Sequence, residues 1–174
     1  NSSVTVSIDG NQLSMTPALN YNGTANITGV LRYGFLTDEE TLTLTVNPVN
    51  DPPIITGQVE LITSEDISIE LSLDDLLVTD VDNSYPDEFT LTVIDSAGFI
   101  VNGTTITPDI NFVGTLTVPV SVDDGSLESS QSELFNLTLV VTPVNDAPVL
   151  SEIGNQVSDE DTPLTITLLS SDVE

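Results

Sequence analysis

Acidic side chains gather in this sequence where strands are predicted to end, and several of them could bind one cation. Asp80 and Asp82 follow an apolar run, and Asp123 stands just before a glycine turn. Asn50 and Asp51 lie together in a proline-rich segment. Calcium takes six to eight oxygen ligands, including carboxylates and amide carbonyls, and an Asp-x-Asp pair can aim two carboxylates at one ion. The spacing of these five residues therefore indicates a Ca²⁺ site.

The other residue types favour the same hard cation. The chain has no Cys and no His, so zinc and similar metals lack their preferred ligands. It also has no disulfide, and small extracellular domains without disulfides often use a metal as their staple. An Asp beside a turn commonly just binds its own backbone. We expect capping, turn or solvent positions of this kind for Asp66, Asp74, Asp75 and Asp124.

The charge of the chain excludes some partners. Its net charge is −27, from 28 acidic residues and the single base Arg32. Contacts to nucleic-acid phosphates need Lys and Arg, so no nucleic-acid partner is expected. An anionic membrane surface is equally unfavourable, and no apolar run approaches the roughly 18 residues of a membrane span. The carboxylates repel one another, which a bound cation would relieve; a solvated acidic surface, as in a salt-adapted protein, stays open as the alternative.

A repeat organises the chain. PVNDPP at 48–53 recurs as PVNDAP at 143–148, an offset of 95 residues, and TPALNYNGT at 16–24 echoes TPDINFVGT at 107–115. We expect the C-terminal half of one repeat in 1–50, a complete repeat in 51–146 and the first strands of another in 147–174. The chain then reads as a piece of a longer protein.

Alternating apolar residues predict an all-β fold for the complete repeat. Strands are predicted near 59–62 and at 67–73, 89–93, 99–106, 115–122 and 134–141, with a hairpin turn at Asn102-Gly103 and a helical turn within 74–78. In the second of these strands Ile67, Ile69, Leu71 and Leu73 are expected to face inward. Pro119 suggests an edge or a bulge. This pattern favours tandem antiparallel Greek-key β-sandwiches.

These ordered motifs resemble cadherin-type repeats, most closely the bacterial cadherin-like repeats of giant secreted adhesins. The resemblance implies calcium ions between consecutive domains and an extracellular, bacterial cell-surface location. For the second junction it implies a further set of ligands: Glu65, Asp109, Asn111, Asn145, Asp146, Asp172 and Glu174. For the first junction it implies Asn50, Asp51, Asp80, Asp82 and Asp123, with a poorer upstream contribution because Ala18 stands where the next repeat has Asp109.

The function this predicts is a calcium-binding extracellular segment of a cell-surface adhesin, in which Ca²⁺ at inter-repeat junctions stiffens an extended stalk. Proline in the linkers favours stiff, extended connections. The expected partners are neighbouring repeats of the same chain. Self-association also stays open, either homophilic or by strand complementation between 149–174 of one molecule and 1–50 of another.

The residue types also bear on two other function classes. A carbohydrate-binding β-sandwich that contacts surface glycans is the alternative, although the chain has no Trp and only Tyr21, Tyr33 and Tyr85 as tyrosines. Tyr21 aligns with Phe112, which favours a core position over a sugar platform. An enzyme is not expected, because the chain lacks His, Cys and Lys, and its acids recur with the repeat. Two carboxylates alone could in principle serve glycoside hydrolysis.

Overall fold

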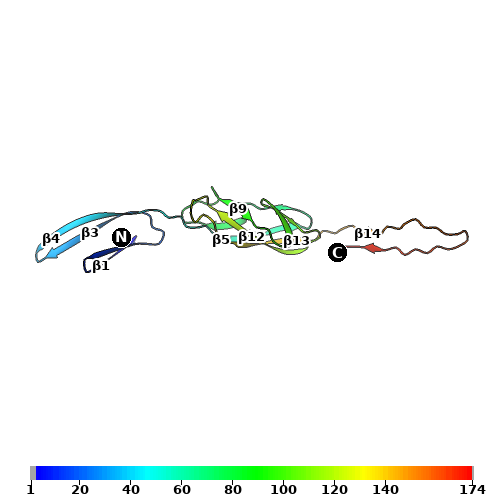
Figure 1. The fold of residues 1–174 in the computed structure, drawn as a ribbon, viewed down its shortest axis with the longest axis horizontal. Coiled ribbons are helices and arrows are strands. Elements are labelled where there is room, and N and C mark those ends of the chain that lie inside the picture. The colour runs from blue at the N-terminus through cyan, green and yellow to red at the C-terminus, as the bar shows by residue number, and fades with distance from the viewer. Residues whose placement is uncertain (1–2, 174) are drawn as a thin grey trace.

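Three parts follow one another along the long axis of the molecule (Figure 1). The computed structural model describes residues 3–173. Residues 3–46 form two hairpins, residues 54–142 form a β-sandwich, and residues 149–171 form a narrow open loop closed by a short strand pair. The predicted all-β fold is confirmed. In the described part of the chain, no helix is long and apolar enough to cross a membrane.

The sandwich is built from nine strands in three sheets. A four-stranded sheet has the order β6-β13-β12-β9, a three-stranded sheet the order β10-β11-β7, and β5 pairs with β8. The strands are β5 (Ile54–Gln58), β6 (Leu61–Ser64), β7 (Ile69–Glu70), β8 (Leu76–Thr79), β9 (Thr90–Val93), β10 (Phe99–Asn102), β11 (Thr105–Pro108), β12 (Gly114–Asp123) and β13 (Phe135–Thr142).

The core lies between these sheets and follows the alternation of the strands. In β12 every second side chain from Leu116 to Val122 is at most 3% exposed, and in β13 Leu137, Leu139 and Val141 are equally buried. Ile106 of β11 faces them and is fully buried. Successive side chains of a strand point to opposite faces, so each strand places one apolar row inside. Each such side chain contributes about 1.5–3 kcal/mol when it is buried.

The chain changes sheets between β5 and β6, where the sequence predicts one strand near 59–62. The structure has two short strands instead, separated at Val59 and Glu60. The second, β6, pairs with β13 in parallel, so the antiparallel prediction is wrong for this pair. The Gln58 side chain fills the interruption, because its amide accepts from the Thr138 N–H at 2.6 Å and donates to the Thr138 carbonyl at 2.8 Å.

The strand predicted at 67–73 is shorter in the structure. Asp66 has a φ of 60°, and the Ile67 N–H donates to the Ser64 carbonyl, so Ile67 belongs to a tight turn. Its side chain is 57% exposed, which makes the inward prediction wrong at this position. Leu71 is buried as predicted, and Ile69 and Leu73 pack against the core. The helical turn predicted within 74–78 is a 3₁₀ turn that lies earlier, at Leu73–Asp75, and the rest of that range belongs to β8.

Pro119 lies inside the four-stranded sheet and not at its edge. The Pro119 carbonyl accepts from the Ile94 N–H at 2.9 Å, just beyond the end of β9. A residue's N–H and C=O point to the same side of a strand, so the missing N–H of Pro119 faces the side where β9 has already ended. The ladder from β12 to β13 is therefore unbroken, and no hydrogen bond is lost.

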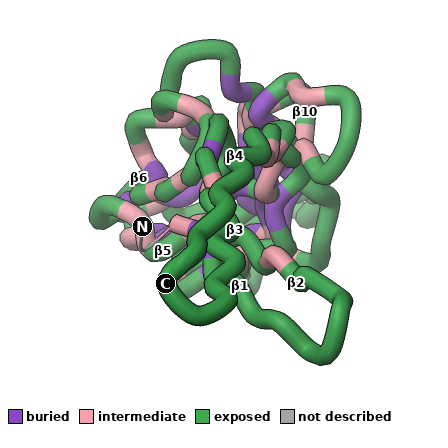
Figure 2. The backbone as a smooth tube through the Cα atoms, turned by 90° about the vertical axis from the view of Figure 1, so that its left-hand side faces the viewer, coloured by how far each residue is buried: buried purple, intermediate pink, exposed green. Residues whose placement is uncertain are grey.

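The hairpins of residues 3–46 are thin and exposed. Their strands are β1 (Val4–Asp9), β2 (Gln12–Pro17), β3 (Gly23–Tyr33) and β4 (Leu36–Val46). Figure 2 shows β1, β3 and β4 mostly as exposed residues. Within 3–46 only Val4 and Ala25 are buried, and the other buried residues belong to the sandwich and its loops. The closing part has β14 (Val149–Leu150) paired with β15 (Ser170–Ser171).

Candidate functional site

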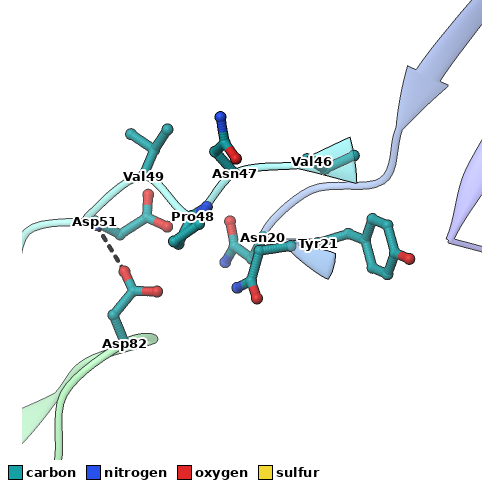
Figure 3. A pocket seen from close by; sticks show the side chains of 9 residues that line it. Asn20, Tyr21, Val46, Asn47, Pro48, Val49, Asp51 and Asp82 are labelled. Atoms are coloured by element: carbon teal, nitrogen blue, oxygen red, sulfur yellow. Dashed lines mark hydrogen bonds between the residues drawn. The ribbon is translucent and has the colours of Figure 1, made fainter. Parts of the chain in front are cut away.

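The five residues predicted for the first junction lie where the linker from the hairpins meets the sandwich. The Asp51 N–H donates to Asp82 Oδ2 at 2.8 Å, which joins the linker to the loop after β8 (Figure 3). Asp80 begins that loop, and its Oδ1 accepts from the N–H groups of Asp82 and Asn83, both at 2.8 Å. The Asp-x-Asp spacing thus gives a turn in which the Asp80 carboxylate holds the backbone of Asp82 in place by hydrogen bonds.

One oxygen of Asp80 is left over in this arrangement. Asp80 Oδ2 is buried and has no hydrogen-bond partner among the described residues. A buried carboxylate oxygen without a partner is unfavourable, because it has lost water and gained no donor. A cation would satisfy this atom.

Two hollows flank the linker at the same place. One, of about 230 Å³, is lined by residues that include Asn20, Asp51 and Asp82 (Figure 3). The other, of about 300 Å³, is lined by residues that include Asn20, Asp51 and Asp80. Both hollows therefore bring together oxygen-bearing side chains from the hairpins, the linker and the sandwich.

Asn20 was missed by the sequence analysis. It lies in the turn between β2 and β3 and has a φ of 58°. Asn111, its aligned counterpart in the sandwich, has a φ of 56°. The alignment of 16–24 with 107–115 already placed these two asparagines opposite each other. The ligand prediction considered only Ala18, whose side chain has no oxygen, and therefore overlooked the side-chain amide of Asn20 two residues later.

Asp124 was also misjudged, because it is not a solvent residue. It is 2% exposed, and Asn50 Nδ2 donates to its Oδ2 at 2.9 Å. Its Oδ1 accepts from the Ser126 N–H at 2.8 Å, so the turn role that the sequence suggests is real. Asn50 further donates to the Ser129 carbonyl and accepts from Ser126 Oγ. The linker is thereby fastened to the loop after β12.

The hydrogen bonds at Asp124 also set its acidity. Burial alone would raise the pKa of this carboxyl group, but the donors from Asn50 and Ser126 hold the pKa below its ordinary value. Asp124 is therefore a carboxylate over the neutral pH range. Asp123, its neighbour, accepts from the Gly125 N–H and from Ser130 Oγ.

No base of the chain compensates these carboxylates. Arg32 is the single basic residue, and it lies in β3 opposite Thr37, close to the tip of that hairpin. The junction lies at the other end of β3 and β4. Neutralisation of its acids therefore has to come from outside the chain.

The second junction is built around Glu65. This side chain is 5% exposed, and its Oε1 accepts from the Val144 N–H at 2.6 Å. Its own N–H donates to the Thr142 carbonyl at 2.9 Å. Glu65 thus ties the end of β6 to the second linker, where Asn145 Nδ2 donates to the Asp146 carbonyl at 2.6 Å.

The other residues predicted for this junction are more dispersed. Asp109 and Asn111 are exposed, and the Asn111 N–H donates to Asp66 Oδ1 at 3.1 Å. Asp172 is exposed and accepts from the N–H of the next residue. Glu174 lies outside the described residues. Within 3–173, no group of three or more acidic side chains is close enough together to hold a metal ion.

The tyrosines do not form a platform for sugars. Tyr21 is half-buried and donates to the Thr24 carbonyl at 2.9 Å. Tyr85 packs edge-on against Phe89 and donates to the Leu73 carbonyl. Tyr33 is 85% exposed, but it lies at the tip of the β3–β4 hairpin, whereas Tyr21 precedes the opposite end of β3.

Comparison with known proteins identifies the family. A family model described as a cadherin-like domain matches residues 49–139, which is just over half of the chain. The chain belongs to the cadherin-like domain family. The predicted resemblance is thus confirmed, and the matched range covers most of the sandwich of this cadherin-like chain, together with the first linker, Asp80, Asp82 and Asp123.

The solved structures that are similar to the cadherin-like chain include the extracellular domain of protocadherin gammaB4. The sequence identity is 13% and the TM-score 0.42, over 87% of this chain and 27% of the other. The chain thus spans about a quarter of that ectodomain. The search among curated proteins found no match.

Proposed function

We propose that this chain is a calcium-binding segment of an extracellular adhesin, in which Ca²⁺ at the junctions between repeats stiffens an extended stalk. The buried, unpartnered Oδ2 of Asp80 beside Asp51 and Asp82 is the observation that carries this proposal. Membership of the cadherin-like family supports it, since domains of this family are extracellular, non-catalytic adhesion modules.

Local structure supports the proposal that the three parts are repeats. Gly23 pairs with Val46 in the β3–β4 ladder. Their aligned counterparts in the sandwich, Gly114 and Val141, pair with each other in the β12–β13 ladder. At the other end of the repeat, Val149 pairs with Ser171 as Ile54 pairs with Thr79.

A turn repeats as well. Asp66 and Asp161, which are 95 residues apart, have φ values of 60° and 61°. In both turns an N–H bonds the carbonyl three residues earlier at 3.3 Å, from Ile67 to Ser64 and from Thr162 to Asp159. Residues 3–46 then correspond to the second half of a repeat and residues 149–173 to the first strands of another.

The donor chemistry at the first junction fits calcium. Asp80, whose Oδ2 has no hydrogen-bond partner, would bind the ion first. Asp51, Asp82 and the amide oxygen of Asn20 would have to move closer to complete the site, because no three acidic side chains of residues 3–173 are grouped closely enough in the structure. These are hard oxygen donors, and they come from both sides of the linker. The bound ion would supply positive charge where the chain has none. Residues that bind from both sides would resist bending of the linker.

A calcium titration by calorimetry tests this proposal. We expect saturable binding with a dissociation constant of about 10⁻⁴–10⁻³ M, the range of extracellular calcium modules. Asp80→Asn with Asp82→Asn is expected to remove the first-junction component. Asp87→Asn with Asp95→Asn is the matched control, because it removes the same charge from exposed positions of the sandwich. Equal loss of binding in both double variants would show that only diffuse surface charge attracts the ion.

A further inference from the structure

The five residues predicted to bind calcium at the first junction fall into two groups. Asp80 has a buried oxygen without a hydrogen-bond partner in the described chain, and hydrogen bonds join it to Asp82 and Asp82 to Asp51. Asn50 and Asp123 differ, because all of their side-chain oxygens already accept hydrogen bonds from the loop after β12. An oxygen that accepts from a donor of the protein is satisfied without a cation. The second group is therefore complete without calcium.

The side-chain amide of Asn50 is bound at both of its ends. Its Nδ2 donates to Asp124 Oδ2 at 2.9 Å and to the Ser129 carbonyl at 3.1 Å, and its Oδ1 accepts from Ser126 Oγ at 2.8 Å. The bond to the carboxylate is charge-assisted, and Asp124 is only 2% exposed. Water therefore competes little for this contact between the linker and the sandwich.

The partners of Asn50 require an amide at this position. The Asp124 carboxylate and the Ser129 carbonyl are acceptors only, so both need the two hydrogens of a side-chain NH₂ group. A carboxylate in place of Asn50 would bring a second negative charge against a buried one. The amide thus neutralises this contact by hydrogen bonds, where two acids would need an ion between them.

We propose that Asn50 and Asp124 form a metal-free lock, which fixes the end of the linker to the sandwich whether or not calcium is bound. In this proposal Asn50 positions the linker and does not bind the junction ion. The lock does not rest on the calcium proposal above, because each of its contacts is made by the chain alone.

The lock determines where the junction bends. From Asn50 onward the chain is fastened, since the Asp51 N–H bonds Asp82 and Pro53 is fully buried. Residues 47–49 lie between β4 and this fastened part and are exposed (Figure 3). Movement of the hairpins relative to the sandwich is therefore confined to residues 47–49.

Thermal unfolding in EDTA tests the lock without calcium. Asn50→Ala is expected to lower the melting temperature of the sandwich by roughly 5 °C or more, because a buried Asp124 oxygen loses its donor. Asn50→Asp is expected to lower it further, because two carboxylates then repel each other. Asn145→Ala is the matched control in the second linker, where the amide donates to the carbonyl of its neighbour Asp146. Equal shifts in Asn50→Ala and Asn145→Ala would overturn the proposal.

A double variant tests whether the two residues act through each other. If they form one lock, Asn50→Ala combined with Asp124→Ala lowers the melting temperature in EDTA by less than the sum of the two single shifts. Shifts that add in full would mean that Asn50 and Asp124 stabilise the fold separately, which contradicts the lock.

Spin labels in EDTA locate the bend. Val49 precedes Asn50 directly and is 79% exposed, and the exposed Thr117 lies in β12, six residues before Asp123 and thus about 20 Å along the strand. Labels on Val49→Cys and Thr117→Cys are expected to give a narrower distance distribution than labels on Thr45→Cys and Thr117→Cys, which span residues 47–49.

Adding Asn50→Ala to the labelled chains completes this experiment. The distribution from Val49→Cys is expected to broaden towards that from Thr45→Cys, because the linker is released from the loop after β12. The comparison of the two label pairs without Asn50→Ala needs no change in the lock itself. Distributions of equal width for the two pairs in that comparison would show that the linker is not fixed at Asn50.

Discussion

Replacement of Asp80 and Asp82 by Asn is expected to remove most of the rise in melting temperature that calcium gives the wild-type chain. An ion that binds only the folded state at one hundred times its dissociation constant adds about 2.7 kcal/mol to the free energy of unfolding. For a sandwich of this size that corresponds to a rise of roughly 10 °C or more. Asn keeps the oxygen that accepts from the backbone of the turn, so the fold without calcium is preserved.

Melts in EDTA and in magnesium complete this test. In EDTA we expect the double variant to melt at or slightly above the wild-type temperature, because two repelling charges are gone. Magnesium is expected to raise the wild-type melting temperature much less than calcium, since it demands a smaller octahedral site and gives up its water reluctantly. An unchanged calcium effect in the double variant would remove Asp80 and Asp82 from the site.

Asp124→Ala is expected to lower the free energy of unfolding in EDTA at neutral pH by about 1–2 kcal/mol. Hydrogen bonds to a charged group contribute about 1.5–3 kcal/mol each in favourable cases, and Asp124 accepts from Asn50 and Ser126. The expected loss is smaller than the sum of these hydrogen bonds, because burial of the carboxylate offsets part of their contribution. The substitution also removes one of the three hydrogen bonds that hold the Asn50 side chain to the loop after β12.

The effect of Asp124 depends on pH in a defined direction. Its pKa is lowered in the folded state, so its stabilising effect is present above the unfolded pKa and is lost as the pH falls through the folded pKa. Urea unfolding at neutral and acidic pH is therefore expected to show a smaller difference between wild type and Asp124→Ala in acid. Asp74→Ala, which removes a carboxyl group from an exposed position, is the matched control. A pH-independent gap would mean that the carboxylate charge at Asp124 does not matter.

Much of the sandwich could be predicted from the alternation of apolar residues. The rows of β12 and β13, the hairpin at Gly103 and the turn at Leu73–Asp75 all come from local patterns. The parallel pairing of β6 could not be predicted, because it depends on where the chain changes sheets. The exposure of Ile67 was hidden for a similar reason, since the turn at Asp66 shifts the start of the strand without changing the alternation.

The site was predicted less completely than the fold. The motifs identify Asp51, Asp80 and Asp82, and the structure brings the Asp51 backbone into contact with Asp82. The burial of Asp124 could not be predicted, because it depends on how Asn50 of the linker crosses the loop after β12, and that contact spans 74 residues of sequence. The place of Asn20 could have been found from its alignment with Asn111. The ligand sets proposed for both junctions stay predictions.

The most direct test of the central proposal is the distance between two spin labels across the first junction, measured with and without calcium. Labels on Thr45→Cys and Thr92→Cys place one probe in the hairpins and one in the sandwich, both at exposed positions. Labels on Thr92→Cys and Thr117→Cys, both within the sandwich, are the control. We predict a narrow distance distribution across the junction in calcium, a broad one in EDTA, and no change in the control pair. Distributions of equal width in calcium and in EDTA would contradict the proposal that calcium stiffens the junction.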